Sequence, residues 1–378
     1  MLKKSYPIII TAVITCTITA MLTFVFTTAY NASTSENMKL RIIEGYLDSV
    51  YYGEYNREKA MESAYKGYVA SLGDPYTEYF TAEEYESFNS YIDSSYCGIG
   101  VTVQYETEKN AILVIDVFDN SPAKTVGIEA GDIIKKVDGK EYTGAQLDNA
   151  VRAIKGEEGT EVKVTVLKAS TGKEEEFTVK RQNVVMDTVE AEIIDGNIGY
   201  IYISQFGNNT ADEFVNKLEE LTSKNIKGLI VDVRNNPGGT TVAVEAVAGC
   251  LLPRDAVIYY SSDKAGNKEY IKSKMDGIDI PLVVLANENS ASAAEILVGA
   301  VKDNSRGTIV GTKTFGKGVV QSLVDLKDGT ALKITVERYY TPNGNYIHGK
   351  GIEPDYYVEL GEKTDTQLEK AISILKNQ

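Results

Sequence analysis

The pattern of apolar and polar residues divides the chain after residue 30 into regions of different character. In residues 31–92 apolar side chains recur at helical spacing, which predicts an N-terminal helical region. Residues 93–182 alternate apolar and polar positions in short runs between glycine-containing turns, which predicts a small strand-rich domain with two helices. In residues 183–360 nearly continuous apolar runs alternate with helical patterns and predict an α/β core. Residues 361–378 are predicted to form a C-terminal helix.

The segment 7–30 is apolar and uncharged, and it follows Lys3 and Lys4 in a short tail of residues 1–6. Its length suffices for a bilayer span, which needs about 20 apolar residues. A cleaved signal peptide is the alternative, although Thr27-Thr28-Ala29 matches a small-residue cleavage site only weakly. We expect an uncleaved transmembrane anchor in the cell membrane, with the tail in the cytoplasm and the folded part outside it.

Composition restricts the chemistry that the folded part can perform. The chain has 378 residues and a formal net charge of −15, which argues against nucleic acid as a partner. The single histidine, His348, excludes zinc sites that need two histidines. Three cysteines (Cys16, Cys97 and Cys250) include no C-x-x-C pair, which excludes a zinc ribbon and a thioredoxin-like site. We therefore expect neither a metal nor an organic cofactor; whether Cys97 and Cys250 pair stays open.

Two segments of the α/β region carry a candidate nucleophile and loop amides. Asp232–Gly239 follows a predicted buried strand, and its glycines can present backbone N–H groups to an anion. The segment Asn287–Ile296 joins a strand to a helix that begins near Ser292. A helix amino terminus stabilises negative charge that develops on a nucleophile and on a carbonyl oxygen. Ser292 and Glu295 also form a capping-box pattern, so a purely structural role stays open, and Ser290 is a rival nucleophile.

A serine nucleophile needs a base, and this chain has almost no histidine. Lys317 lies between glycines with apolar neighbours, where burial would lower its pKa from about 10.4 toward 7–8. Most lysines are solvated, so spacing alone does not identify a base, and His348 stays an alternative. The sequence from Gly311 to Lys317 also matches the start of a phosphate-binding loop. Gly318 stands where that loop needs serine or threonine, which disfavours an NTPase.

Residues 93–182 resemble a PDZ domain. The resemblance rests on five fragments in the expected order: Gly98-Ile99-Gly100, Ser121-Pro122-Ala123, Gly127-Ile128, Ala130-Gly131-Asp132 and Val137-Asp138-Gly139. A PDZ domain binds an extended chain end as an added strand and holds its carboxylate with loop N–H groups. The resemblance implies that Gly98, Ile99 and Gly100 contact apolar C-terminal tails. Lys155 stands where family members can carry a peptide-sensing arginine. Lysine lacks the planar guanidinium with which arginine binds a partner through two hydrogen bonds.

Together these segments resemble the carboxyl-terminal processing proteases, which are PDZ-containing serine peptidases with a Ser-Lys-Gln site. The resemblance implies that Ser292 is the nucleophile, Lys317 the general base and Gln321 the residue that orients the lysine. It also implies an oxyanion hole of backbone N–H groups, which we match to Ala293 and to Gly238 or Gly239. In a straight strand Lys317 and Gln321 would be about 13 Å apart, so a bend near Gly318 is required.

The resemblance predicts a multidomain α/β fold. In it an α/β serine protease core carries an inserted PDZ domain, an N-terminal helical segment and an N-terminal transmembrane helix. The predicted function is that of an extracytoplasmic serine endopeptidase that recognises C-terminal tails and forms an acyl-enzyme. A homodimer is consistent with the self-association of family members. The alternative from another class is a catalytically inactive PDZ scaffold that binds peptides in the cell envelope.

Overall fold

The computed structural model describes residues 19–21, 23 and 35–377, in two compact units that meet between Tyr65 and Lys66. The predicted anchor at residues 7–30 lies almost entirely outside the described residues. Within the part that is described, no helix combines the length and the apolar character that a bilayer span requires.

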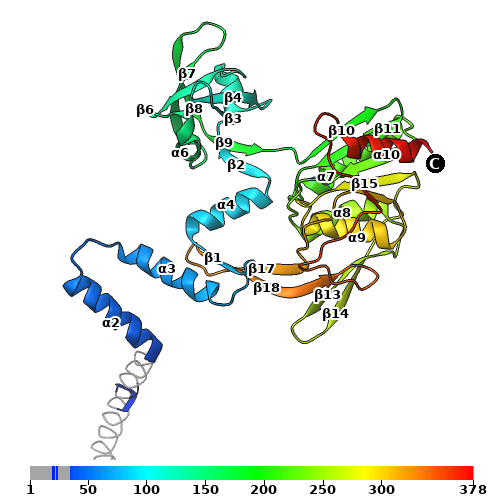
Figure 1. Ribbon diagram of the computed structural model, residues 1–378. Helices are drawn as coiled ribbons and strands as arrows, with labels where there is room; N and C mark the ends of the chain where they lie inside the picture. Colours follow the sequence, from blue (N-terminus) through cyan, green and yellow to red (C-terminus); the bar gives the residue numbers. More distant parts are fainter. Residues whose placement is uncertain (1–18, 22, 24–34, 378) are drawn as a thin grey trace, which may run out of the picture. The chain divides into compact units, whose positions relative to one another are not determined.

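The first unit is helical, as the apolar spacing of residues 31–92 predicts. It contains α2 (Ser35–Val50) and the start of α3 (Arg57–Ala70) (Figure 1). Arg57 and Glu44 form an ion pair of 2.8 Å within it. The apolar residues at helical spacing in α2 are largely exposed: Met38, Ile42, Tyr46 and Val50. In α2 the spacing therefore predicted the helix but not burial of its apolar face.

The strand-rich region forms a separate sheet with its own apolar core. The sheet order is β3 (Val101–Glu106), β4 (Ala111–Val117), β5 (Ile133–Val137), β7 (Glu161–Leu167) and β8 (Glu174–Lys180), with the short strand β6 (Lys140–Glu141) paired to β5. Helices α5 (Pro122–Val126) and α6 (Leu147–Ile154) are the two that the sequence predicts. A two-stranded ladder of β2 (Ser95–Gly98) and β9 (Gln182–Val185) connects the ends of this domain. Because β3 pairs only with β4, one edge of β3 is open.

The protease-like core is built on a six-stranded sheet whose order is β10-β11-β12-β15-β16-β19. Its strands are β10 (Val189–Ile194), β11 (Ile198–Ile203), β12 (Gly228–Asp232), β15 (Leu282–Ala286), β16 (Thr308–Gly311) and β19 (Tyr356–Tyr357). Strand β10 runs antiparallel to β11, and the other pairs are parallel. Every residue of β12 and β15 is buried, as their continuous apolar runs predict.

Helices cover both faces of this sheet (Figure 1). Residues of α7 (Thr210–Ser223), α8 (Thr241–Leu251) and α9 (Ala293–Asp303) share the larger core cluster on one face. On the opposite face α10 (Thr366–Lys376) packs Ala371 against Ile230 and Val283. The predicted C-terminal helix is therefore part of the core of this domain.

A second sheet joins distant parts of the chain. In it β1 (Glu78–Phe80) and β13 (Val257–Asp263) both pair with β18 (Ala331–Tyr340), which also pairs with β17 (Val319–Asp325). The strand β14 (Lys268–Lys272) completes a hairpin with β13 that the apolar pattern does not predict. Helix α4 (Ala82–Ile92) follows β1 and begins with the capping box of Thr81 and Glu84. Since β1 precedes the strand-rich domain and β18 follows it, that domain is an insertion in the chain path of this sheet.

Candidate active site

Ser292 lies at the amino end of α9 in an unusual backbone conformation. Its φ is 55° and its ψ −115°, which few residues with a side chain adopt. Such a conformation costs about 1–3 kcal/mol and persists only where the surroundings impose it. Here the Ser292 N–H donates to Glu295 Oε2 at 3.0 Å, and the Ser292 carbonyl accepts from the Glu295 N–H at 2.9 Å. The sharp turn from the loop after β15 into α9 therefore fixes Ser292.

The rival nucleophile Ser290 is a structural residue in this geometry. Its side chain is fully buried, and its hydroxyl donates to the Val233 carbonyl at 2.8 Å. It also accepts from the Asn287 N–H at 2.9 Å. Ser292, by contrast, is partly exposed. Of the two serines, the structure leaves only Ser292 accessible to a substrate.

Glu295 joins the two segments that carry Ser292 and Lys317. Its carboxylate is fully buried and accepts four hydrogen bonds. Oε2 accepts from the backbone N–H groups of Ser292 at 3.0 Å and Lys317 at 2.8 Å. Oε1 accepts from the Gly316 N–H at 2.7 Å and the Thr314 hydroxyl at 2.6 Å. The capping-box pattern signalled the local bond, but nothing in the sequence indicated the bonds to residues 314–317.

Tyr339, on β18, links the same two segments through their carbonyl groups. Its side chain is buried, and its hydroxyl lies 2.5 Å from the Lys317 carbonyl oxygen and 3.1 Å from that of Ser292. Burial, followed by the charge of Glu295, raises the pKa of this hydroxyl well above its ordinary value, so it remains a donor. Glu295 and Tyr339 together hold the backbones of Ser292 and Lys317 side by side. In the sequence Tyr339 looks like an ordinary core residue of a strand.

Lys317 has the electrostatic surroundings of a potential general base. Burial, reinforced by the positive charge of Lys333, lowers its pKa below the ordinary value of lysine. The carboxylates of Glu78, Asp74 and Glu295 oppose this shift without reversing it. The amine lies 4.9 Å from the ring centroid of Tyr76, and within the described residues it forms no hydrogen bond or ion pair. A lysine with a lowered pKa and no fixed partner can accept a proton.

Gln321 lies on β17 but is bonded to a residue other than Lys317. Its side-chain amide donates to the Thr335 hydroxyl at 3.4 Å. In residues 35–377 no hydrogen bond joins the Lys317 amine to Gln321 or to the Ser292 hydroxyl. The β17–β18 ladder has a register shift between Val320 and Gln321. The bend that we expected near Gly318 stays a prediction. The structure thus brings Ser292 and Lys317 together through their backbones, while their side chains are not engaged with each other.

The two glycines of the loop after β12 differ in what their amides do. At Gly238, φ is 101° and an added Cβ would lie 2.7 Å from Ser292 Cβ, so only glycine allows this approach. The Gly238 N–H, however, donates to Asn236 Oδ1 at 2.8 Å. The N–H groups of Gly239 and Ala293 have no acceptor within the described residues. Of the three candidate amides, those of Ala293 and Gly239 are therefore free to donate, while Gly238 permits close packing against Ser292.

The contacts of His348 are with residues other than Ser292. Its Nδ1 accepts from the Gly318 N–H at 3.4 Å, and its ring packs beside Tyr346 and Tyr76, each at a centroid distance of 5.9 Å. No hydrogen bond to Ser292 is present in the described range 35–377. A histidine-based hydrolase therefore finds no support in this arrangement.

Comparisons with known proteins identify the two domains. A sequence model of a PDZ domain matches residues 91–167, and one of peptidase family S41 matches residues 197–358. The Staphylococcus haemolyticus protein named "Probable CtpA-like serine protease" is 36% identical over 352 residues, which cover 92% of this chain and 70% of that protein. The chain belongs to peptidase family S41.

Other relatives of this S41 peptidase carry the name of the carboxyl-terminal processing group. The carboxy-terminal processing protease CtpB of Bacillus subtilis is 36% identical over 312 residues, or 82% of this chain and 65% of that protein. The solved structure of a photosystem II D1 C-terminal processing protease is 30% identical, with a TM-score of 0.51, and covers 91% of this chain and 92% of its own. The expected family, a PDZ-containing carboxyl-terminal processing serine protease, is thereby confirmed.

The PDZ domain of this S41 peptidase has a groove at the open edge of β3. A cavity of about 680 Å³ lies between β3, α6 and α4. Ile99 and Lys155 line it, with apolar side chains such as Val101, Val103 and Val151. Gly98 and Gly100 are not among its lining residues: Gly98 pairs with Gln182 in the β2–β9 ladder. The Lys155 amine lies 5.2 Å from the ring centroid of Tyr96 in the same cavity.

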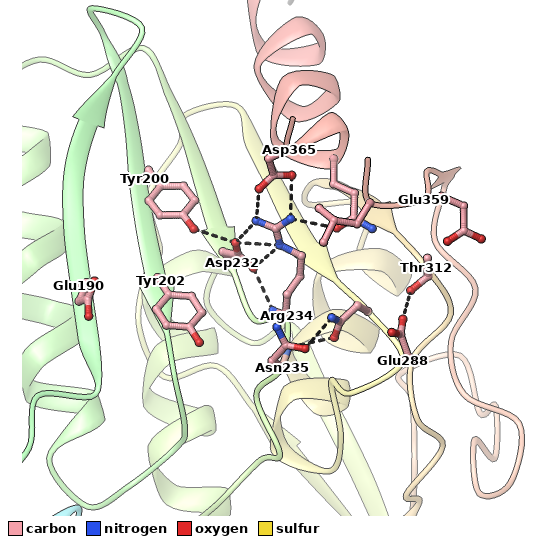
Figure 2. Close-up of a pocket in the computed structure, with 13 residues that line it drawn as sticks. Glu190, Tyr200, Tyr202, Asp232, Arg234, Asn235, Glu288, Thr312, Glu359 and Asp365 are labelled. Carbon is pink, nitrogen blue, oxygen red and sulfur yellow. Dashed lines mark hydrogen bonds and ion pairs between the residues drawn. The ribbon is translucent and has the colours of Figure 1, made fainter. Parts of the chain in front are cut away.

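A partly buried ion-pair group connects α10 to the loop that carries the glycines. Figure 2 shows Arg234 between Asp232 and Asp365 in a pocket of about 450 Å³. The guanidinium lies 2.6 Å from Asp232 and 2.8 Å from Asp365, and the Tyr200 hydroxyl donates to Asp232 at 2.8 Å. Burial is the largest single effect on Asp365 and would raise the pKa of that carboxyl. The hydrogen bond and charge of Arg234, together with the backbone N–H groups of Leu368 and Gln367, outweigh it and lower the pKa. Asp365 also caps α10 by accepting from the Leu368 N–H.

Cys97 and Cys250 are free thiols in the structure. Cys97 lies on β2 and Cys250 in α8, and burial raises the pKa of both, that of Cys250 to about 11. The pairing that the sequence left open is absent among the described residues.

Proposed function

We propose that this S41 peptidase is a serine endopeptidase in which Ser292 is the nucleophile and Lys317 the general base. The observation that carries the proposal is the shared carboxylate of Glu295, which accepts from the backbone N–H groups of both residues. Two features of the side chains add support. Ser292 begins α9, and the pKa of Lys317 is lowered by burial in the absence of a hydrogen-bonding partner among the described residues.

In the proposed reaction the neutral Lys317 amine takes the proton of the Ser292 hydroxyl as its oxygen attacks the scissile carbonyl. The N–H groups of Ala293 and Gly239 donate to the resulting oxyanion. When the tetrahedral intermediate collapses, the C–N bond breaks and the Lys317 ammonium returns its proton to the leaving amine. Lys317 then removes a proton from a water molecule, which attacks the acyl carbon. The bond between that carbon and the Ser292 oxygen breaks, the Lys317 ammonium returns its proton to this oxygen, and the second product leaves as a carboxylic acid.

The proposed chemistry requires a small rearrangement of Lys317. Its amine rests against Tyr76, and Gln321 is bonded to Thr335. Catalytic hydrogen bonds are often absent before substrate binds and form in the Michaelis complex. We expect the amine to turn from Tyr76 toward the Ser292 hydroxyl, and Gln321 to orient it there.

We further propose that the PDZ groove receives an apolar C-terminal tail as a strand beside β3. The open edge of β3 supplies backbone N–H and carbonyl groups, and the apolar lining of the cavity suits apolar side chains. For cellular location we propose a membrane anchor at residues 7–30 with the peptidase outside the cytoplasm. The support is the apolar run after Lys3 and Lys4. A homodimer also stays a prediction, which sedimentation of the full chain in detergent would test.

The deciding experiment compares the full chain with its Ser292→Ala and Lys317→Ala variants on an unfolded protein that ends in apolar residues. Cleavage is followed by mass spectrometry. We expect products from the wild type alone. Cleavage that survives in Lys317→Ala would refute the assigned base. Binding of the tail without cleavage by any of the three proteins would favour the peptide-binding scaffold.

A further inference from the structure

The Lys317 amine rests on the face of an aromatic ring from a distant segment. Tyr76 lies in the turn between α3 and β1, and its ring centroid is 4.9 Å from the amine. That distance is within the range of cation–π contacts, which extend to about 6 Å. The contact attracts the ammonium form through the ring quadrupole and offers the neutral amine no comparable attraction. Tyr76 therefore discriminates between the two protonation states of the residue proposed as the base.

Tyr76 is held in place independently of Lys317. Its N–H donates to Asp74 Oδ1 at 3.0 Å, and the Thr77 hydroxyl donates to Asp74 Oδ2 at 2.6 Å. The Thr77 hydroxyl in turn accepts from the Thr335 N–H at 3.0 Å, which ties the turn to β18. The adjacent strand β1 pairs with β18, so the backbone that carries the ring is fixed beside the amine.

The same network keeps Gln321 away from the lysine. Thr335, whose N–H holds Thr77, uses its hydroxyl to accept from the Gln321 side chain at 3.4 Å. The segment from Asp74 to Thr77 and the strand β18 that it contacts thus hold the side chains of Lys317 and Gln321 in a resting position. Glu295 and Tyr339 meanwhile keep the backbones of Ser292 and Lys317 together.

We propose that Tyr76 is a positioning residue for Lys317: its ring retains the protonated amine and releases the neutral amine to Ser292. This inference rests on the proposed role of Lys317 as the base. Proton loss from the ammonium to solvent removes the attraction of the ring, and the free amine then turns to the Ser292 hydroxyl. The ring thereby delays activity until the lysine is able to accept a proton.

Other charged groups around Lys317 also affect its pKa. They come from β18, β1, the turn before it and α9: Lys333, Glu78, Asp74 and Glu295. The neutral ring of Tyr76 also contacts His348, the single histidine of the chain, whose Nδ1 accepts from the Gly318 N–H. Substitutions at Tyr76 leave all of these groups in the protein. A change in Lys317 titration can therefore be assigned to the ring.

The first test is the pH dependence of kcat/KM for the full chain and two variants. Tyr76→Leu keeps an apolar side chain but removes the π face. We expect the acidic limb of its kcat/KM profile to lie about 0.5–1 pH unit lower than in the wild type. At pH values below the limb, its kcat/KM should be about three- to tenfold higher. Tyr76→Phe keeps the face and should leave the limb at the wild-type position. An unmoved limb in Tyr76→Leu, or the same shift in both variants, would overturn the inference.

The second test does not depend on proteolysis. Lysine labelled with ¹³C at Cε is incorporated into the Ser292→Ala protein, and the Lys317 signal is assigned by its loss in Lys317→Arg. Phenylalanine and its increasingly fluorinated analogues at position 76 keep the ring shape while weakening the face. A stepwise fall in the Lys317 pKa with fluorination is expected, and a pKa that stays constant across the series would refute a role for the ring face.

These two tests separate failure of the inference from failure of the proposed function. If Lys317→Ala still cleaves substrate, the assigned base is wrong, whatever the titration shows. If Lys317→Ala is inactive but the fluorinated series leaves the Lys317 pKa unchanged, the dyad stands and the role of Tyr76 falls. Because ring analogues preserve packing, the second test remains decisive even if Tyr76→Leu fails to fold.

Discussion

Ser292 and Lys317 donate their backbone N–H groups to the same oxygen atom, Oε2 of Glu295, at 3.0 and 2.8 Å. Neither residue is close to the other in sequence, and their side chains share no hydrogen bond within the described residues. A buried carboxylate with four donors is strongly fixed, because each lost bond would leave a buried polar group unpaired. The relative position of nucleophile and base is therefore set by a residue that need not touch the substrate.

Replacing Glu295 with glutamine should damage both stability and catalysis. The amide group retains one acceptor oxygen and turns an NH₂ toward N–H donors. Leaving one or two buried donors unpaired costs about 2–4 kcal/mol of unfolding free energy. We expect kcat/KM to fall at least tenfold in the fraction that remains folded. Urea denaturation and proteolysis assays measure the two effects, and Glu288→Gln, on an exposed loop residue, serves as the matched control. Full activity in Glu295→Gln would contradict the role given to this carboxylate.

Lys317→Met should abolish cleavage while making the protein more stable at neutral pH. The pKa of Lys317 is lowered by burial, so the unfolded chain binds its proton more tightly than the folded one. Folding is therefore opposed below the folded-state pKa, and this penalty disappears as pH rises through the unfolded-state pKa. Methionine lacks the charge, and we expect a gain of about 0.5–2 kcal/mol at pH 7 that vanishes near pH 11. A loss of stability at pH 7 would contradict the desolvation of Lys317.

Gly238→Ala should inactivate the enzyme through its contact with Ser292. The added Cβ would lie 2.7 Å from both Ser292 Cβ and the Ala291 carbonyl oxygen, and the φ of 101° is unfavourable for alanine. We predict a fall in kcat/KM of at least a hundredfold, on the scale of losing an oxyanion donor. Gly196→Ala is the control, since its φ of 85° imposes similar backbone strain with no neighbour within 4 Å. If both variants lose activity equally, the contact with Ser292 is not the cause.

Breaking the Arg234–Asp365 pair should weaken the attachment of α10 and lower activity together. Asp365 has a lowered pKa, so its contribution to stability is present above the pKa of the unfolded carboxyl and is lost as pH falls through the folded-state value. Asp365→Ala also removes the cap of α10, which costs about 1 kcal/mol. Figure 2 shows the same guanidinium bonded to Asp232, which lies at the end of β12 just before the loop residue Asn235. Circular dichroism of Asp365→Ala, measured against pH, should show this loss of stability. Removal of the exposed Lys224–Glu220 pair should leave stability unchanged.

The sequence predicted the strands and helices that carry the candidate site, but it did not predict the hydrogen bonds between them. The buried run of β15 followed by a polar loop and an apolar helix indicated that Ser292 begins a helix, and the structure has it there. The glycines and apolar neighbours of Lys317 indicated burial of its amine, and burial does lower its pKa. The hydrogen bonds from residues 314–317 to Glu295 join two loops that are distant in the sequence. The spacing of apolar residues does not predict which loops contact each other.

Long-range contacts explain the other differences. Gln321 bonds Thr335 because β17 and β18 pair in a register that places the two residues opposite each other. Tyr76 reaches Lys317 because β1 joins β18 from the far end of the chain. The hairpin of β13 and β14 was missed because its exposed second strand has no strong apolar pattern. Each of these features arises from strand pairing between distant segments, which short sequence windows do not contain.

The most direct test of the Ser-Lys assignment is covalent labelling of the full chain with an alkyl fluorophosphonate, followed by peptide mapping. We predict modification of Ser292 alone, at a rate that rises with pH, falls at least a hundredfold in Lys317→Ala and persists in His348→Ala. Modification of Ser290, or labelling of Ser292 that depends on His348 and not on Lys317, would contradict the account.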